Sequence, residues 1–207
     1  VNGDGYADIV LGFGTDYFEN FDYDGVGNPD TTDGMVEIIH GASLANLIEQ
    51  QGNQTWTSFL SPTGSSDSDF GYDIAVGDIN NDGYDDIIVG APYADESSLL
   101  DDDDGAFYII YGQASLKINT YDSDAESYES SDYGTSITYF SEFSGGFEDS
   151  EFGEAIAVGD FNGDGFDDIA VSMNEYGFEG GEGLVFIYLG GTFGIPIKTV
   201  MVHGIEE

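Results

Sequence analysis

Two loops of the chain carry the residue types and the spacing of a cation site. In the stretch DINNDGYDD, carboxylate or amide side chains stand at positions 1, 3, 5 and 9, and glycine stands at position 6. These residues are Asp78, Asn80, Asp82, Asp86 and Gly83. Hard cations such as Ca²⁺ take roughly six to eight oxygen ligands, which alternate side chains and one backbone carbonyl can supply. Gly83 allows the sharp turn, because glycine adopts positive φ at no steric cost.

A second loop repeats this pattern in full, and a third stretch repeats it in part. The stretch DFNGDGFDD places its ligand residues and its glycine at Asp160, Asn162, Asp164, Asp168 and Gly165. The chain opens on a third copy, whose matching residues are Asn2, Asp4, Asp8 and Gly5. Position 1 of this copy would precede Val1, so we expect the given sequence to begin within a loop and a preceding strand to be missing.

An EF-hand begins with a similar pattern, but it requires a carboxylate at position 12 and a following helix. Position 12 of the central loop is Val89, and the residues from Asp86 to Gly90 form an apolar, β-branched run. Such a run is typical of a strand. We therefore expect each loop to join two strands, with Asp86 as the closing ligand; an acidic, solvated hairpin without metal is the alternative.

The segments around the loops also repeat in order, which indicates one recurring unit. The two complete loops are preceded by predicted strands over Tyr72–Gly77 and Glu154–Gly159. All three loops are followed by strands over Ile9–Gly12, Ile87–Gly90 and Ile169–Ser172. Alternating third strands are predicted over Met35–His40, Ala106–Tyr111 and Leu184–Leu189, and more polar fourth strands over Thr55–Leu60, Thr135–Phe140 and Lys198–His203.

Four antiparallel strands per unit are typical of a β-propeller blade. The sequence therefore predicts an all-β fold of about three blades, the first incomplete at its N-terminus: a partial blade over residues 1–60, a second over 61–140 and a third over 141–207. Three inserts without periodicity, at residues 15–33, 95–104 and 119–150, are interpreted as surface loops. Ala42–Gln50 is the one segment expected to form a helical turn or two.

The charge of the chain excludes several classes of partner. It has 42 Asp and Glu residues against 2 Lys and Arg residues, for a formal net charge of -40. Nucleic acids and anionic membranes would be repelled by this charge. Hydrophobic residues make up 40% of the chain, which favours a folded core beneath the acidic surface. No apolar run is long enough for a transmembrane helix, so no membrane insertion is expected.

The sequence offers no catalytic constellation. It contains no cysteine, and its two cations are Lys117 and Lys198, so thiol chemistry and arginine clamps are excluded. His40 and His203 both fall late in predicted strands, where packing at the strand end is the simpler interpretation. Carboxylates are so abundant that two could stand at glycosidase spacing by accident. We therefore expect a protein that is not an enzyme.

With loops, strands and their order established, the pattern resembles the FG-GAP repeat of integrin α-subunit β-propellers and related extracellular proteins. The central repeat has Phe70-Gly71 before its first strand and Gly90-Ala91-Pro92 after its second. The last repeat keeps Phe152-Gly153 and its whole loop, but it has Ser172-Met173-Asn174 in place of GAP. The first repeat keeps only Gly12 of GAP.

The resemblance implies structural Ca²⁺ in the hairpins, with two complete sites and a partial N-terminal one. Carried over to this chain, it adds the backbone carbonyls of Tyr84, Phe166 and Tyr6, at position 7 of each loop, to the ligands named above. It also implies an extracellular or cell-surface binding, adhesion or structural module, with a protein or glycan ligand. Such blades also accompany secreted carbohydrate-active enzymes, and part of such an enzyme is the alternative function.

The number of repeats departs from the family, whose propellers typically have seven blades. An open stack of blades leaves unpaired strand edges at both ends. We expect either further blades in a longer chain or neighbouring subunits that supply the missing strand, a head-to-tail self-association that gives a filament when the contact does not close. A fragment of a larger repeat protein is the favoured of these two interpretations.

Overall fold

The computed structural model of the 207-residue chain describes residues 1–14, 34–41, 55–60, 68–94, 105–114, 119–122, 127–128, 137–140, 151–173, 183–192 and 197–203. All elements in these residues are β-strands, so the predicted all-β class is confirmed. The described residues include no helix that is long and apolar enough to cross a membrane.

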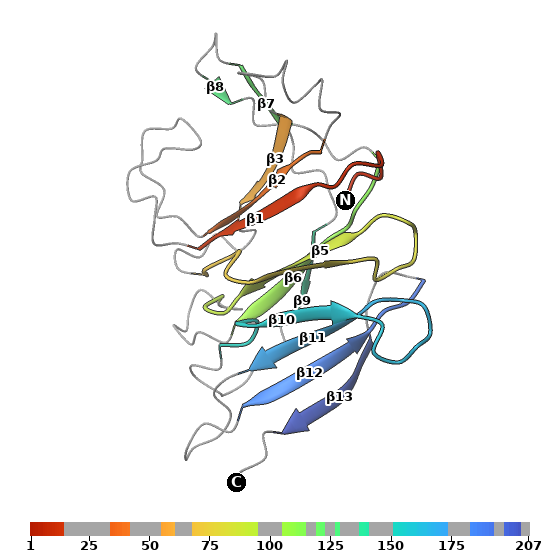
Figure 1. The fold of residues 1–207 in the computed structure, drawn as a ribbon. Coiled ribbons are helices and arrows are strands. Elements are labelled where there is room, and N and C mark those ends of the chain that lie inside the picture. The colour runs from red at the N-terminus through yellow and green to blue at the C-terminus, as the bar shows by residue number, and fades with distance from the viewer. Residues whose placement is uncertain are drawn as a thin grey trace.

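The strands form three antiparallel sheets, which we call sheets 1, 2 and 3 (Figure 1). Sheet 1 has the order β1 (Ile9–Phe13), β2 (Met35–Ile39), β3 (Thr55–Leu60), β7 (Asn119–Asp122) and β8 (Ser127–Tyr128). Sheet 2 consists of β4 (Ile74–Gly77), β5 (Asp86–Ala91), β6 (Ala106–Ile110) and β9 (Ile137–Phe140). Sheet 3 consists of β10 (Ile156–Gly159), β11 (Asp168–Met173), β12 (Leu184–Leu189) and β13 (Ile197–His203).

Sheets 2 and 3 have the predicted four strands in the predicted order. Their first strands are shorter than expected, because β4 and β10 begin only at Ile74 and Ile156. In sheet 1, β1 corresponds to the second strands of the other sheets, β5 and β11. Those strands pair with the first strands β4 and β10, whereas β1 is the edge strand among the described strands of sheet 1. The predicted helical segment and the inserts over residues 15–33 and 95–104 lie outside the described residues.

The interpretation of residues 119–150 as loop was wrong at its start. Strand β7 pairs with β3, with Thr120 opposite Thr55 and Asn119 opposite Trp56, and β8 pairs with β7. These two strands extend sheet 1 by backbone pairing at its edge. Such pairing does not require an alternation of apolar side chains, which explains why periodicity did not reveal it.

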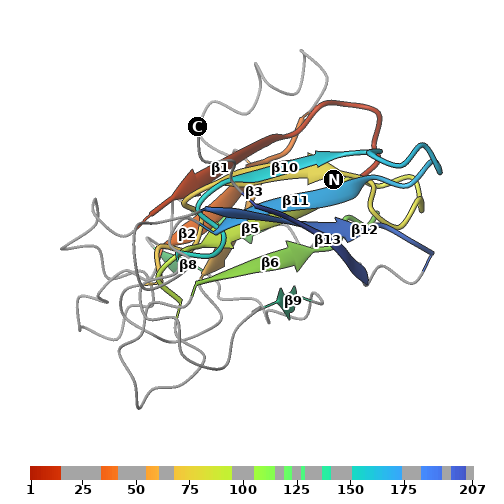
Figure 2. The same ribbon diagram turned by 90° about the horizontal axis from the view of Figure 1, so that it is seen from below.

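The three sheets follow one another in a stack, with sheet 2 in the middle (Figures 1 and 2). Because successive side chains of a strand point to opposite faces, β5 and β6 contribute to two cores. Ile87 and Tyr108 belong to the core against sheet 1, whereas Ile88 and Phe107 belong to the core against sheet 3. All six residues of β5 are buried, which explains its nearly continuous apolar sequence.

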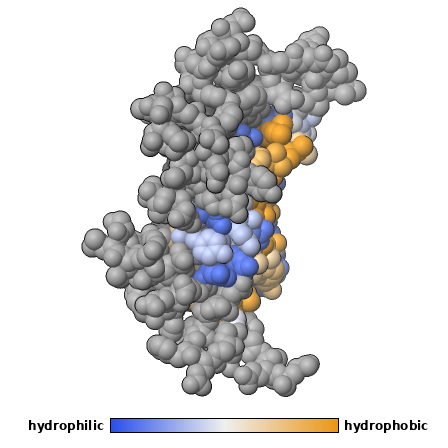
Figure 3. Space-filling view, turned by 90° about the vertical axis from the view of Figure 1, so that its left-hand side faces the viewer, coloured by the Kyte–Doolittle hydropathy of each residue, from blue (hydrophilic) through white to orange (hydrophobic). Residues whose placement is uncertain are grey.

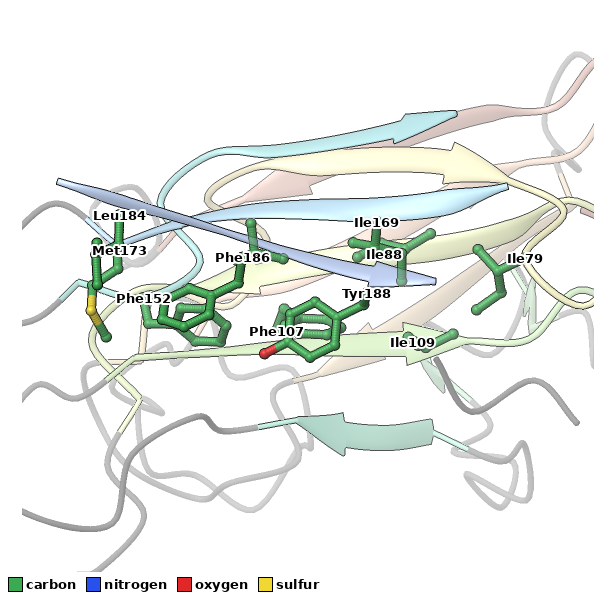
Figure 4. Close-up of a cluster of buried hydrophobic side chains, with 11 residues drawn as sticks. Ile79, Ile88, Phe107, Ile109, Phe152, Ile169, Met173, Leu184, Phe186 and Tyr188 are labelled. Atoms are coloured by element: carbon green, nitrogen blue, oxygen red, sulfur yellow. The ribbon is translucent and has the colours of Figure 1, made fainter. Parts of the chain in front are cut away.

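Aromatic rings fill the core between sheets 2 and 3 (Figure 4). Phe152 packs edge-on against Phe186, with ring centroids 5.5 Å apart, and Phe107 packs similarly against Tyr188 at 5.1 Å. Met173 and Leu184 lie at one end of this row and Ile79 at the other (Figure 4). Edge-to-face packing of aromatic rings adds to the energy of apolar burial.

Each Phe-Gly pair docks one sheet onto the sheet before it. Phe70 forms a parallel bridge with Gly34, which precedes β2, and Phe152 forms the same bridge with Gly105, which precedes β6. A Cβ atom at Gly34 would lie 2.1 Å from the Phe70 carbonyl oxygen, and one at Gly105 would lie 2.3 Å from that of Phe152. Glycine is therefore required on the receiving sheet as well as in the Phe-Gly pair.

Candidate metal centres

The three acidic loops lie at the same edge of the stack (Figure 1). Loop 2 (residues 78–86) joins β4 to β5, and loop 3 (residues 160–168) joins β10 to β11. Loop 1 (residues 2–8) precedes β1. The predicted position of each complete loop, between the first and second strands of its sheet, is therefore observed.

The side chains of loop 2 fold inward onto their own backbone. Both carboxylate oxygens of Asp78 accept hydrogen bonds, from the N–H of Asp82 (3.0 Å) and of Gly83 (2.9 Å). The Asp82 N–H also donates to Asn80 Oδ1 (2.9 Å). The oxygens at positions 1 and 3 therefore converge on one nitrogen. The Asp82 carboxylate in turn accepts from the N–H of Tyr84 (2.9 Å).

Loop 3 has the same internal geometry. The Asp164 N–H donates to Asp160 Oδ1 (3.0 Å) and to Asn162 Oδ1 (2.8 Å), and the Phe166 N–H donates to Asp164 Oδ1 (3.0 Å). Loop 1, which has no position-1 residue in the given sequence, shows the hydrogen bonds made by the N–H groups of positions 5 and 7. The Asp4 N–H donates to Asn2 Oδ1 (3.1 Å), and the Tyr6 N–H donates to Asp4 Oδ1 (2.8 Å).

Positive φ angles at two positions produce the sharp turn in each loop. Position 6 is Gly5, Gly83 or Gly165, with φ of 87°, 90° and 91°, as the sequence predicted for Gly83. Position 4 also has positive φ, at Gly3, Asn81 and Gly163. Asn81 fits because asparagine tolerates the left-handed region better than other residues with a Cβ atom.

The ninth-position aspartates close the loops through the backbone. Asp86 is fully buried and accepts from the N–H of Ile79 (3.2 Å), in its own loop, and of Gly112 (2.9 Å), which follows β6. Asp168 accepts in the same way from Phe161 (2.9 Å) and Gly190 (2.9 Å). Each of these carboxylates thus ties its loop to the end of the third strand, a contact that the spacing within the loop does not reveal.

Asp8 repeats this arrangement in loop 1 and has a histidine beside it. Its carboxylate accepts from the N–H of Asn2 (3.4 Å) and of Gly41 (2.8 Å). His40 is buried, with Nδ1 3.7 Å from Asp8 Oδ1 and 3.3 Å from the Asn2 side-chain nitrogen. The predicted packing role at the strand end is observed for His40, although its contact with loop 1 was not predicted; the side chain of His203 lies outside the described residues.

Burial raises the pKa of Asp86 to about 7. The negative charges of Asp82 and Asp78 raise this pKa further, whereas the hydrogen bonds from Gly112 and Ile79 lower it. Three carboxylates of loop 2 therefore interact electrostatically at close range. A cation among them would favour their charged forms, because an opposite charge within about 4–6 Å stabilises a carboxylate.

The donor chemistry of loops 2 and 3 fits a hard cation such as Ca²⁺. Each loop offers three carboxylates, one amide oxygen and the position-7 carbonyl, all of them oxygen ligands. Within the described residues, no group of three or more acidic or histidine side chains is arranged so that it could hold a metal ion. The carboxylates of Asp86 and Asp168 accept hydrogen bonds from backbone N–H groups instead.

The structural role of Asp86 can be separated from a role in metal binding. In the presence of chelator, we expect Asp86→Ala to lower the free energy of unfolding by about 2–4 kcal/mol, because it leaves two buried N–H groups without their acceptor. The exposed Asp82 provides the control, and Asp82→Ala should cost less than about 1 kcal/mol under the same conditions. Urea unfolding measures both values. Equal losses would contradict the role given to Asp86.

Comparison with known proteins agrees with this geometry. Residues 70–110 and 152–188 match the family model of the FG-GAP repeat, and the two matched segments begin at the docking residues Phe70 and Phe152. The chain belongs to the FG-GAP repeat family. Its sheets are accordingly blades of the FG-GAP type.

The curated relatives of this FG-GAP chain include integrin α-subunits. It is 34% identical to integrin alpha-V of Gallus gallus over 92% of the chain, and 38% identical to integrin alpha-6 of Gallus gallus over 81%. It is 37% identical to integrin alpha-7 of Mus musculus over 65% of the chain. The matches cover only 16%, 14% and 9% of these relatives, respectively. The predicted integrin α-like family is therefore confirmed for a region that is short beside these relatives.

Proposed function

We propose that the chain is a Ca²⁺-stabilised, extracellular binding or adhesion module. The observation that carries this proposal is the repetition of one network in loops 2 and 3. In both loops, the backbone N–H of position 5 donates hydrogen bonds to the side-chain oxygens of positions 1 and 3. The similarity to integrin α-subunits favours a cell-surface or secreted location and a protein ligand over a glycan.

The proposed cation ligands are the oxygen donors of each loop. In loop 2 they are Asp78, Asn80, Asp82, the Tyr84 carbonyl and Asp86. In loop 3 they are Asp160, Asn162, Asp164, the Phe166 carbonyl and Asp168. Loop 1 offers Asn2, Asp4, the Tyr6 carbonyl and Asp8 as a partial site. Bound Ca²⁺ would stiffen the hairpins by neutralising their crowded carboxylates.

A role within a carbohydrate-active enzyme is the competing function. The comparisons with integrin α-subunits favour the binding module instead. Incubation with a panel of polysaccharides, followed by an assay for reducing ends, tests the choice. We expect no hydrolysis. If the chain hydrolyses a polysaccharide, and substitution of one carboxylate outside the three loops abolishes this hydrolysis, the enzyme function is favoured over the binding module.

The outward face of sheet 3 supports a further part of the proposal, head-to-tail self-association. Phe161 is 51% exposed and Val185 is 38% exposed, whereas their counterparts in the previous repeat, Ile79 and Phe107, are fully buried against sheet 3. Separately from this face, Figure 3 shows apolar side chains of the described residues gathered along one margin of the stack. A second copy could cover the outward face of sheet 3 as sheet 3 covers sheet 2.

We expect self-association to strengthen with salt, because the net charge of -40 opposes contact between copies at low ionic strength. At high salt, the double substitution of Phe161→Asp and Val185→Asp should weaken the association at least about tenfold, since buried apolar side chains contribute roughly 1.5–3 kcal/mol each. Sedimentation velocity measures both effects. Tyr72→Asp, at an exposed residue before β4, is the control. A chain that remains monomeric at every salt concentration would refute self-association.

A further inference from the structure

Asp167, at position 8 of loop 3, makes a reciprocal contact with loop 2. Its Oδ2 accepts a hydrogen bond from the N–H of Asp78 (3.0 Å), and its own N–H donates to the Asp78 carbonyl (3.3 Å). Asp78 stands at position 1 of loop 2. Both backbone polar groups of this residue are therefore bonded to one residue of the next repeat.

The close approach of Asp167 depends on a glycine in sheet 2. A Cβ atom at Gly77 would lie 2.6 Å from Asp167 Oδ2 and 2.4 Å from Val158 Cγ1. Gly159 holds the same place in sheet 3, but a Cβ atom there would meet only the Phe161 ring, at 3.4 Å. The tight approach at Gly77 therefore arises where sheet 3 packs on sheet 2, whereas no described sheet packs against the corresponding side of Gly159.

A second backbone contact joins the same two repeats. The Gly191 N–H donates to the carbonyl of Ile79 (2.9 Å), so positions 1 and 2 of loop 2 are both held by the next repeat. One repeat earlier, the Gln113 N–H donates to the carbonyl of Val1 (3.0 Å), which holds position 2 of loop 1. The position-2 contact therefore recurs between repeats.

The contact with Asp167 holds the backbone from which the Asp78 carboxylate projects. That carboxylate in turn accepts from two amides of loop 2, those of Asp82 and Gly83. The consecutive acidic residues of loop 3 thus have different roles. Asp168 closes loop 3 through Phe161 and Gly190, whereas Asp167 holds loop 2.

We propose that Asp167 is a positioning residue for the cation of loop 2, so that docking of one repeat prepares the metal site of the repeat before it. This inference rests on the proposed function, in which loop 2 binds Ca²⁺. Groups that orient metal ligands without touching the metal typically contribute about 10–100-fold to affinity. Loop 2 therefore binds its cation more tightly when Asp167 accepts the Asp78 hydrogen bond.

The test compares Asp167→Ala with Asp167→Asn. Both substitutions remove the negative charge, but asparagine keeps a side-chain oxygen that can accept from the Asp78 N–H. Asp85→Ala removes the same charge from position 8 of loop 2, and it is the matched control. The probe is Tb³⁺, which replaces Ca²⁺ and emits when a nearby tyrosine is excited.

The emission can be assigned to loop 2. Position 7 is Tyr84 in loop 2 and Phe166 in loop 3, and Asp4→Ala is introduced into all variants to disable loop 1 with its Tyr6. We expect Asp167→Ala to weaken the affinity for Tb³⁺ at loop 2 about tenfold. Asp167→Asn should weaken it no more than Asp85→Ala does.

A second readout needs no metal. With chelator present, the amide hydrogen of Asp78 should exchange faster in Asp167→Ala than in Asp167→Asn, since only alanine removes its acceptor. Equal losses of Tb³⁺ affinity in the two Asp167 variants, in a chain that binds Tb³⁺, would overturn this inference alone. Absence of Tb³⁺ binding by the chain with native loops 2 and 3 would refute the proposed function and this inference with it.

Discussion

Removal of Ca²⁺ should lower the melting temperature of the chain by about 10–20 °C. A ligand at 100 times its Kd stabilises the folded state by about 2.7 kcal/mol per site, and loops 2 and 3 offer two sites. For a chain of this size, each kcal/mol corresponds to roughly 2–4 °C. Calorimetry with and without a Ca²⁺ chelator measures the shift.

The acidic surface requires a specific control in this experiment. General screening of the net charge of -40 by added ions would also raise stability, so the monovalent salt concentration is kept high and constant. The double variant with Asp78→Ala and Asp160→Ala loses the position-1 ligand of both loops. Its melting temperature should no longer respond to chelator. A variant that responds as strongly as the unsubstituted chain would show that the stabilisation arises elsewhere.

Substitution of Gly105 by alanine should cost more stability than the same change at Gly163, which has nearly the same backbone angle. Gly105 and Gly163 have φ of 78° and 79°, so alanine is strained by a similar amount at both, roughly 1–2 kcal/mol. A Cβ atom at Gly105 would also lie within 2.4 Å of the Phe152 backbone nitrogen, whereas none of the surrounding heavy atoms comes within 4 Å of one at Gly163.

Gly163→Ala is therefore the matched control for Gly105→Ala. We expect Gly105→Ala to lower the free energy of unfolding by about 1–3 kcal/mol more than Gly163→Ala, the usual cost of overpacking. Denaturant unfolding in the presence of chelator measures both values, so that cation binding at loop 3, which contains Gly163, does not contribute to the difference. Equal losses would mean that the bridge between Phe152 and Gly105 does not limit the docking of sheet 3 onto sheet 2.

The parts of the fold that were predictable are those encoded locally. The order of ligands in each loop requires a turn with positive φ at position 6, and Gly83 has φ of 90° there. The strand after each loop could be predicted because β5 and β11 are buried, β-branched runs. The rings of β6 and β12 are buried, as is typical of large apolar side chains on interior strands, and they are Phe107, Tyr108, Phe186 and Tyr188.

The parts that could not be predicted depend on contacts between distant segments. Strands β7 and β8 lack apolar alternation, and they form by pairing with the edge of β3. The bonds of Asp86 to Gly112 and of Asp167 to Asp78 join residues 26 and 89 positions apart, respectively. The spacing within a loop gives no information about such partners, although the recurrence of a glycine after each third strand, at Gly41, Gly112 and Gly190, was a visible signal.

Titration calorimetry of the chelator-treated chain with Ca²⁺, at high constant monovalent salt, measures directly how many cations loops 2 and 3 bind. We expect at least two bound ions per chain, the loss of one in Asp78→Ala and the loss of a different one in Asp160→Ala. Absence of saturable binding, or a number of bound ions that neither substitution changes, would contradict this expectation.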